Sequence, residues 1–231
     1  MDQIEAIVYP LEKNNRQLLD KNKIKELIPD IQPRDYRVLD HTFNYKLACL
    51  IIREKGYIIK LNGIRAIVTQ NFIYLFHDDV EDFYLHLQYY FDNPNIISKE
   101  IPFELKIFEV MLIYLCEKSD KILLELVKKV KSVSIQNINS SKLSQILKVQ
   151  NELSSYEQMF EDIRKIIYDL MKSEEDMFRI YLSKKAKEED NVKEDDQKKI
   201  DEFEILLETY EKQIKEDLNQ VTRLRMEIDS I

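Results

Sequence analysis

Two patterns of hydrophobic residues follow one another along the chain. Up to about residue 76 the apolar residues form short runs rich in Ile, Val, Tyr and Phe, which are typical of strands. From Pro102 onward apolar residues recur every three or four positions, which is the period of a helix. The change of period predicts an α+β fold: a small, mostly antiparallel sheet with flanking short helices, followed by long helices.

The sheet is predicted to consist of a first strand and a meander. Residues 4–11 (IEAIVYPL) form the first strand, and the meander strands cover residues 47–53, 57–61, 64–69 and 72–76. Asn62 and Gly63 join two of these strands, and Asn-Gly is the strongest short signal for a tight hairpin turn. Because the runs are almost continuously apolar, we expect helices to cover much of both faces of the sheet.

A short helix is predicted between the first strand and the meander. It covers residues 20–28, with Asp20 as its N-terminal cap. Pro29 and Pro33 end it and predict an extended passage into residues 36–39.

Three long helices are predicted in the second half of the chain. The first starts at Pro102 and ends at the break formed by residues 137–141, where Ser141 caps the second. The second runs to about residue 184, a length of about 65 Å. A charged loop over residues 188–196 precedes the third, which starts near Lys198 and carries a narrow apolar stripe along its whole length. No stop signal precedes Ile231, so we expect this helix to continue beyond it.

Composition excludes several classes of protein. Gly56 and Gly63 are the only glycines, which excludes the glycine-rich loops that bind nucleotides. Cys49 and Cys116 lie in apolar runs and are expected to be buried thiols of a reducing compartment. There is neither a leader peptide nor a run of about twenty apolar residues, so we expect the chain as given to be soluble.

The negative charge is concentrated at the end of the chain. The net charge is −8, and residues 1–150 carry +1 whereas residues 151–231 carry −9. Such a surface argues against nucleic acid as a partner, because affinity for nucleic acid depends on basic side chains. It favours a cation or a basic partner.

Several motifs, in order along the chain, resemble the CorA-type magnesium transporters, in their eukaryotic mitochondrial-type branch (the mitochondrial RNA-splicing type magnesium channels). They are residues 33–40 (PRDYRVLD), the meander from Ile51 to Phe76, residues 101–105 (IPFEL) with Glu109, residues 174–183 (EEDMFRIYLS), residues 202–211 (EFEILLETYE), and the pairs Leu224-Arg225 and Ile228-Asp229. Each motif is weak alone, but together they cover nearly the whole chain. The Gly-Met-Asn pore signature of the family does not occur in this sequence, so the resemblance is to the soluble N-terminal domain.

The resemblance implies how the chain is organised and what it does. Residues 1–100 are an α/β regulatory subdomain, 101–185 a long helical hairpin, 186–196 an acidic linker, and 197–231 a stalk helix cut before the transmembrane segment. Five copies surround a pore in the mitochondrial inner membrane, with this domain in the matrix. Mg²⁺ is both the transported and the regulatory ion, and its binding between subunits favours the closed state. No enzymatic activity and no nucleic-acid partner are implied.

Carboxylates in the acidic part are the expected Mg²⁺ ligands, since Mg²⁺ prefers oxygen ligands and is usually held through one or two carboxylates. Asp229 is the first choice and Asp217 the second, while Asp78 and Asp79 are candidates supplied by a neighbouring subunit. Glu204, Glu208 and Glu211 share one face of the stalk. For each carboxylate, the alternative is an ordinary solvated side chain.

Lysines flank the turn near residues 136–141, which the resemblance places toward the membrane. The membrane-proximal candidates are Lys128, Lys129, Lys131 and Lys142, with Lys148 nearby. They are suited to meet anionic head groups or to modulate ion entry. Lysines that only increase solubility are the alternative.

Two other classes of function compete with the channel domain. A freestanding scaffold that forms a coiled coil with an unrelated partner is supported by the stripe of the last helix. A metal-dependent hydrolase rests on His77-Asp78 alone, and such a site needs further ligands that three histidines in the whole chain hardly supply.

Overall fold

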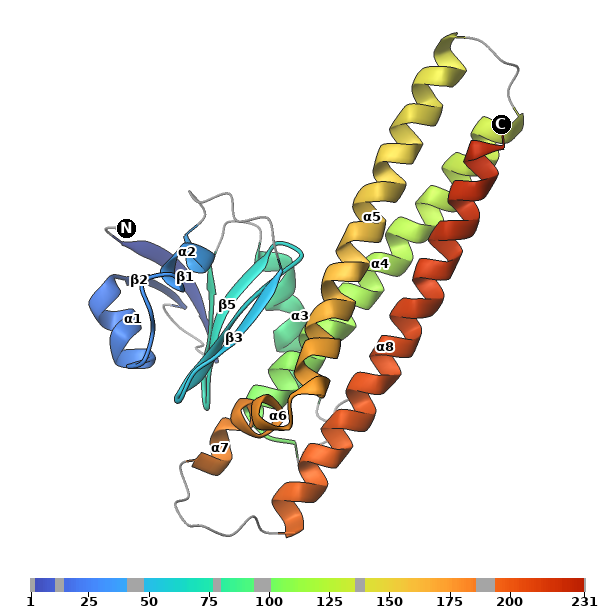
Figure 1. The fold of residues 1–231 in the computed structure, drawn as a ribbon. Helices are drawn as coiled ribbons and strands as arrows, with labels where there is room; N and C mark the ends of the chain where they lie inside the picture. Colours follow the sequence, from blue (N-terminus) through green and yellow to red (C-terminus); the bar gives the residue numbers. More distant parts are fainter. Residues whose placement is uncertain are drawn as a thin grey trace.

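The structure, a computed structural model, describes residues 3–10, 15–40, 48–76, 80–93, 101–135, 140–185 and 194–230. A sheet with short helices lies against one side of a rod made of long helices (Figure 1). The α+β architecture predicted from the change of hydrophobic period is confirmed.

One antiparallel sheet contains all six strands of the described part of the chain. They are β1 (Ile4–Tyr9), β2 (Arg16–Leu19), β3 (Cys49–Ile52), β4 (Gly56–Leu61), β5 (Ile64–Thr69) and β6 (Ile73–Phe76), in the order β2-β1-β6-β5-β4-β3. The predicted meander is therefore confirmed as β3 to β6. Strand β2 has no counterpart in the predictions, because only its last residue, Leu19, is buried and no apolar run marks it.

The two glycines occupy positions of the meander that other residues do not fit. In the β4–β5 turn Asn62 has φ 44° and Gly63 φ 89°, as a tight hairpin turn requires. At the start of β4, a Cβ on Gly56 would lie 2.6 Å from the carbonyl oxygen of Val68 in the paired strand. Both positions therefore explain why the few glycines of this chain are found here.

Helices cover both faces of the sheet, as expected. On one face Ile58 and Ile67 pack with Ile24 of α1 (Lys21–Leu27) and with α2 (Tyr36–Leu39). On the other face Tyr57 and Ile59 share a core with α3 (Glu81–Asp92) and with the long helices. The sheet is therefore a central layer, and its second face joins it to the rod.

The predicted short helix is confirmed, but the passage after it is not extended. Asp20 caps α1, accepting a hydrogen bond from the backbone N–H of Lys23 at 2.8 Å. Residues 36–39 form α2 instead of the expected extended segment. The carboxylate of Asp35 accepts a hydrogen bond from the backbone N–H of Gln32 at 2.9 Å, which closes a turn directly before α2.

In the part of the chain that the structure describes, the rod consists of three long helices and two short ones. They are α4 (Phe103–Ile135), α5 (Ser140–Lys172), α6 (Glu174–Ile180), α7 (Leu182–Lys185) and α8 (Glu194–Asp229). Helix α8 begins at Glu194, so the last three residues of the predicted charged loop are helical. Residues 186–193 and most of the predicted break at 137–141 lie outside the described residues.

The single helix expected over residues 141–184 is wrong, because the chain leaves the helix at Ser173 and again at Tyr181. Ser173 has extended backbone angles, and its hydroxyl accepts a hydrogen bond from the backbone N–H of Asp176 at 3.1 Å. A serine cap followed by acidic residues stabilises a new helix start in place of continuation.

The apolar stripe of α8 is buried within the chain itself. Phe203, Leu207, Ile214, Val221 and Ile228 are at most 4 % exposed, and α8 runs along both α5 and α4 (Figure 1). The stripe is therefore already partnered, which removes the support it gave to a coiled coil with an unrelated protein. None of the helices in the described residues has the length and apolar character that crossing a bilayer requires.

Candidate cation-binding surface of the helical rod

Asp217 faces the interior of the rod. Its side chain is 2 % exposed; the amide of Gln213 donates to one carboxylate oxygen at 3.3 Å, and the other oxygen is buried without a hydrogen-bond partner. Burial raises the pKa of Asp217, and the negative charge of Asp120 raises it further. A carboxylate in this position is closed to an ion that a second subunit would share.

The spacing of the sequence contains a signal for this burial. Asp217 lies three residues after Ile214 and four before Val221, so it occupies the same face as the apolar stripe. Its surroundings include Cys116 of α4 and Tyr156 of α5, whose pKa values are raised by burial and by the charge of Asp217.

Asp229 lies at the opposite extreme, exposed in the last turn of α8. The side-chain amide of Gln150 in α5 donates to its carboxylate at 2.9 Å. One turn earlier, Arg225 donates to Ser154 at 3.0 Å and pairs with Glu157 at 2.7 Å. The end of α8 is therefore fixed to α5, and Asp229 is held in a defined position while it remains open to solvent.

The two candidate ligands that the structure describes do not form one site. Asp217 and Asp229 are twelve residues apart on one helix, a separation of about 18 Å. Asp78 and Asp79 lie outside the described residues. Among the residues that the structure does describe, no three His, Cys, Asp or Glu side chains gather closely enough to hold a metal ion.

The outward face of α8 is acidic but partly neutralised. Glu204 and Glu208 are exposed, and Glu208 lies 4.0 Å from the ammonium of Lys212. Glu211 accepts a hydrogen bond from Arg164 of α5 at 3.3 Å. Among the predicted ligands that the structure describes, Asp229 is the one that is both exposed and held in position by a hydrogen bond.

The predicted basic residues differ from one another in their surroundings. Lys128 and Lys131 are exposed, and Lys129 pairs with Glu152 of α5 at 2.6 Å. Lys142 is only 4 % exposed, so it is not available at the surface. Its spacing of seven residues from the buried Val149 is the signal that places it on the inner face of α5.

Two of the sequence motifs hold the fold together, a role that their patterns did not predict. In the PRDYRVLD motif, Asp35 is fully buried and accepts hydrogen bonds from Arg53 at 2.6 and 3.0 Å. Arg53 follows β3, so this ion pair fixes the segment around α2 to the edge of the sheet. Both donors of Arg53 reach the same oxygen, Oδ2, which also accepts from Gln32, while Oδ1 is buried without a hydrogen-bond partner. Charge-assisted hydrogen bonds of this kind are stronger than those between neutral groups.

The IPFEL motif supplies a second connection. The carboxylate of Glu104, at the start of α4, accepts hydrogen bonds from the backbone N–H and the hydroxyl of Ser183 in α7 at 2.6 and 3.0 Å. The hydroxyl of Tyr57 in β4 donates to the backbone carbonyl of Glu104 at 2.9 Å. Glu104 thereby joins the sheet, the first long helix and the segment that leads toward α8.

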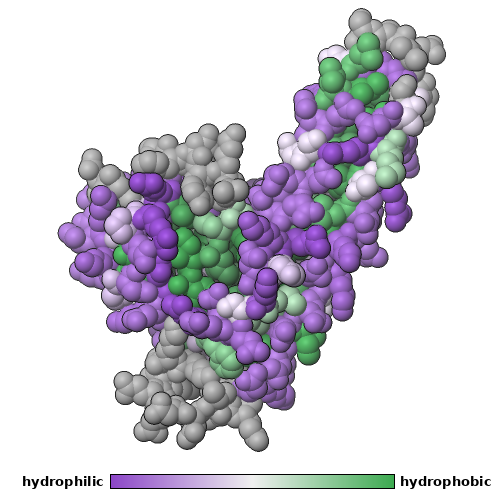
Figure 2. All heavy atoms as spheres, in the orientation of Figure 1, coloured by the Kyte–Doolittle hydropathy of each residue, from purple (hydrophilic) through white to green (hydrophobic). Residues whose placement is uncertain are grey.

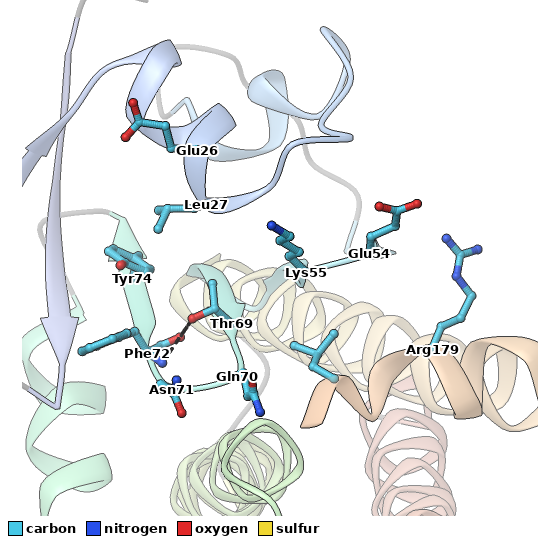
Figure 3. Close-up of a pocket in the computed structure, with 11 residues that line it drawn as sticks. Glu26, Leu27, Glu54, Lys55, Thr69, Gln70, Asn71, Phe72, Tyr74 and Arg179 are labelled. Carbon is cyan, nitrogen blue, oxygen red and sulfur yellow. Dashed lines mark hydrogen bonds between the residues drawn. The ribbon is translucent and has the colours of Figure 1, made fainter. Parts of the chain in front are cut away.

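A cleft of about 830 Å³ lies between α1, the β5–β6 turn and α6 (Figure 3). Its charged lining contains Glu26 and Glu54 as well as Lys55 and Arg179, and Thr69 closes the turn at its base by hydrogen bonds with Phe72. Opposite charges in one open cleft select neither a cation nor an anion. None of the predicted site residues lines it.

The comparisons with known proteins agree with the motif series. The family model described as "Magnesium transporter MRS2-like" matches residues 11–231. The mitochondrial inner membrane magnesium transporter mrs2 of Schizosaccharomyces pombe is 28% identical over 204 residues, which are 83% of this chain and 47% of that protein.

Two further relatives give similar values. The mitochondrial inner membrane magnesium transporter LPE10 of Yarrowia lipolytica is 26% identical, over 83% of this chain and 44% of its own length. The magnesium transporter MRS2-5 of Arabidopsis thaliana is 27% identical, over 77% of this chain and 46% of its own length. The chain thus spans somewhat less than half the length of these relatives.

Proposed function

The chain belongs to the MRS2-like family of magnesium transporters, and on this basis we propose that it is the Mg²⁺-sensing regulatory part of a membrane magnesium channel. The family match over residues 11–231 is the observation that carries this proposal. The proposed role is regulation of transport, without catalysis.

The location and assembly are part of the same proposal. Two of the relatives are named as transporters of the mitochondrial inner membrane, which supports that membrane, with this part of the protein in the matrix. Transmembrane helices outside this sequence would anchor the chain, and five copies would surround the pore. Mg²⁺ would be the transported ion as well as the regulatory one.

Asp229 is the proposed ligand on α8. Mg²⁺ keeps most of its water molecules and needs only one or two carboxylates, so an exposed carboxylate in a fixed position is suitable for weak binding. A neighbouring subunit would supply the second carboxylate, with Asp78 and Asp79 as candidates. Asp217 is a weaker candidate than Asp229, because its carboxylate is buried and the rod would have to open before it could reach an ion.

Binding between subunits gives a physical reason for regulation. Facing carboxylates of two copies repel one another, and a shared divalent cation offsets this repulsion and stabilises the assembled, closed state. Loss of the ion loosens the contact. A coupling of this kind is typically about 1–3 kcal/mol, enough to change the populations of two states several-fold.

A magnesium titration tests the proposal. The thermal midpoint and the molar mass are measured as MgCl₂ is added, and we expect a stabilisation or a change of assembly at millimolar concentrations. Asp229→Ala weakens this response. Asp201→Ala is the matched control, since Asp201 also lies exposed on α8 and also accepts a hydrogen bond from a glutamine amide, that of Gln197 at 2.8 Å.

Two results would contradict the proposal. The first is the absence of any response to Mg²⁺ up to tens of millimolar, which would favour a scaffold without a cation-dependent role. The second is an equal loss of response in the Asp229 and Asp201 variants, because it would show that only the total charge of α8 matters.

A further inference from the structure

The end of the hairpin formed by α4 and α5 differs in charge from the rest of the molecule. Between Glu125 and Glu152 the sequence contains five lysines and no aspartate or glutamate, although the net charge of the chain is −8. We call the described residues of this region, 126–135 and 140–151, the hairpin tip. The hairpin tip is a basic segment in an acidic protein, and the acidic side chains of α8 that contact it are Glu227 and Asp229, through Ser134 and Gln150.

The same region exposes leucines. Leu143 and Leu147 of α5 are 56 % and 62 % exposed, and their spacing of four residues places them on one face of the helix. Lys142, next to them, is buried. The first two turns of α5 therefore turn apolar side chains outward and a lysine inward, the reverse of an ordinary surface helix.

The charged and apolar side chains lie at the same end of the rod. Lys128 and Lys131 are exposed within seven residues of the end of α4, and Leu143, Leu147 and Lys148 within eight residues of the start of α5. At 1.5 Å per residue, all of them lie within about 12 Å of the hairpin end along the helix axes. Figure 2 shows apolar side chains at this end of the rod, among hydrophilic ones.

We propose that the hairpin tip binds the surface of a bilayer that contains anionic lipids. Lys128, Lys131 and Lys148 would contact phosphate groups, while Leu143 and Leu147 would enter the boundary between head groups and acyl chains. Basic residues combined with exposed leucines on a helix are the features that place a helix end at such a surface. Lysines alone would be compatible with any anionic ligand. The exposed leucines favour a lipid surface, because it offers an apolar layer beneath the phosphate groups.

Charge complementarity favours a lipid surface over a second copy of the chain. Two hairpin tips that met through their leucines would bring their lysines together and repel one another. None of these five residues is a proposed Mg²⁺ ligand, so replacing them tests lipid binding without removing a ligand for the cation.

Vesicle binding tests this inference. The full chain is mixed with vesicles of phosphatidylcholine alone or with phosphatidylserine added, in EDTA so that divalent cations do not bridge protein and lipid. Cosedimentation is then measured at low and high salt. We expect binding to the anionic vesicles only, with a decrease as salt increases.

Two variants separate the contributions. Lys128→Gln/Lys131→Gln is expected to lower the partition onto anionic vesicles by about ten-fold or more. Leu143→Ser/Leu147→Ser is expected to lower it at every salt concentration, because the apolar contact is not screened. Lys212→Gln/Lys215→Gln removes the same charge from the middle of α8 and should leave binding unchanged. Circular dichroism and the thermal midpoint verify that each variant folds.

Three outcomes would overturn the inference. The first is equal binding to neutral and anionic vesicles, or no binding to either. The second is a loss of vesicle binding in the α8 control variant equal to that in the Lys128/Lys131 variant. The third is a change in the molar mass of the protein, measured without lipid, when the leucines are replaced. The last result would assign the leucines to an interface between copies of the chain.

Discussion

Glu104 and Ser183 are 79 residues apart in the sequence, yet two hydrogen bonds join them, from the backbone N–H of Ser183 at 2.6 Å and from its hydroxyl at 3.0 Å. Glu104 is fully buried, and burial raises the pKa of its carboxyl, whereas the bonds from Ser183 lower it. The charge that burial disfavours is thus held by donors at the start of α7. This arrangement fixes how the chain leaves the hairpin.

Replacing Glu104 by Gln should weaken this connection. The amide keeps the shape of the side chain but has one acceptor oxygen in place of two, so it cannot accept all the hydrogen bonds that the carboxylate accepts, and those that remain lose the assistance of the charge. We expect a loss of about 1–3 kcal/mol in the free energy of unfolding, measured by urea denaturation. Glu125→Gln, an exposed change on the same helix, should stay within about 0.5 kcal/mol.

A double-mutant cycle with Ser183→Ala assigns the loss to the pair. The coupling between the two changes should be at least about 0.5 kcal/mol if the hydroxyl and the carboxylate interact in solution. Additive effects would show that each residue acts alone, and would contradict the connection described here.

The buried ion pair of Asp35 and Arg53 should be more costly to break. Arg53→Ala leaves the fully buried carboxylate of Asp35 without the guanidinium that donates two hydrogen bonds to its Oδ2, and we expect a loss of about 3–5 kcal/mol in the free energy of unfolding. Arg34 offers a matched control, because it also approaches Asp35, at 3.8 Å, but its side chain is 75 % exposed. Equal losses for Arg34→Ala and Arg53→Ala, measured by chemical denaturation, would refute the importance of the buried geometry.

The two glycines should respond differently to alanine. At Gly56 the new Cβ would meet a backbone oxygen at 2.6 Å, which cannot move aside easily, and we expect a loss of about 1–3 kcal/mol. At Gly63 the space is open, but φ of +89° is unfavourable for alanine, so the loss should be about 1 kcal/mol. The thermal midpoints of both variants measure this; a larger loss at Gly63 would contradict the order.

His86 predicts a dependence of stability on pH. Burial lowers its pKa below the ordinary 6.5, although Glu117, 4.0 Å away, raises it, and Lys121 lowers it. The unfolded chain therefore binds the proton more readily, and the free energy of unfolding decreases as the pH falls through about 6.5. Tyr90 and Tyr114 pack against the ring, and its Nε2 is buried without a hydrogen-bond partner.

Comparison with His86→Gln isolates this effect. The variant cannot titrate, so its stability should decrease less between pH 7.5 and 5.5 than that of the unchanged protein, whatever its stability at the starting pH. His41 and His77 are the same in both proteins and cancel in the comparison. Parallel pH profiles would disprove the contribution of His86.

Local and periodic signals account for what the sequence predicted correctly. Asn62-Gly63 specifies its turn through backbone angles that few other residues adopt, and the stripe of α8 requires partners along its length. The break at Ser173 was missed because the apolar period continues through it, and a single side-chain hydrogen bond decides the outcome. Strand β2 pairs with β1 through its backbone, which leaves little trace in the side chains.

The site residues were harder to predict, because exposure depends on which helices meet. Asp217 and Asp229 are both acidic and both on α8, yet one faces the core and the other solvent, and only the position of Asp217 on the face of the apolar stripe indicates this difference. The pairs Asp35–Arg53 and Glu104–Ser183 connect distant segments, so no local pattern contains both partners. The sequence motifs therefore predicted the family and the fold class, but they did not predict which contacts each residue makes.

Hydrogen bonds Gln150–Asp229 and Ser134–Glu227 join the last turns of α8 to the hairpin tip, and the ion pair Arg225–Glu157 joins them to the next part of α5. Because these contacts reach both α4 and α5, they oppose any tilt of the end of α8 relative to the hairpin. A displacement of the tip would consequently also displace Asp229. Any contact that fixes the position of the tip would therefore also influence the position of the Asp229 carboxylate.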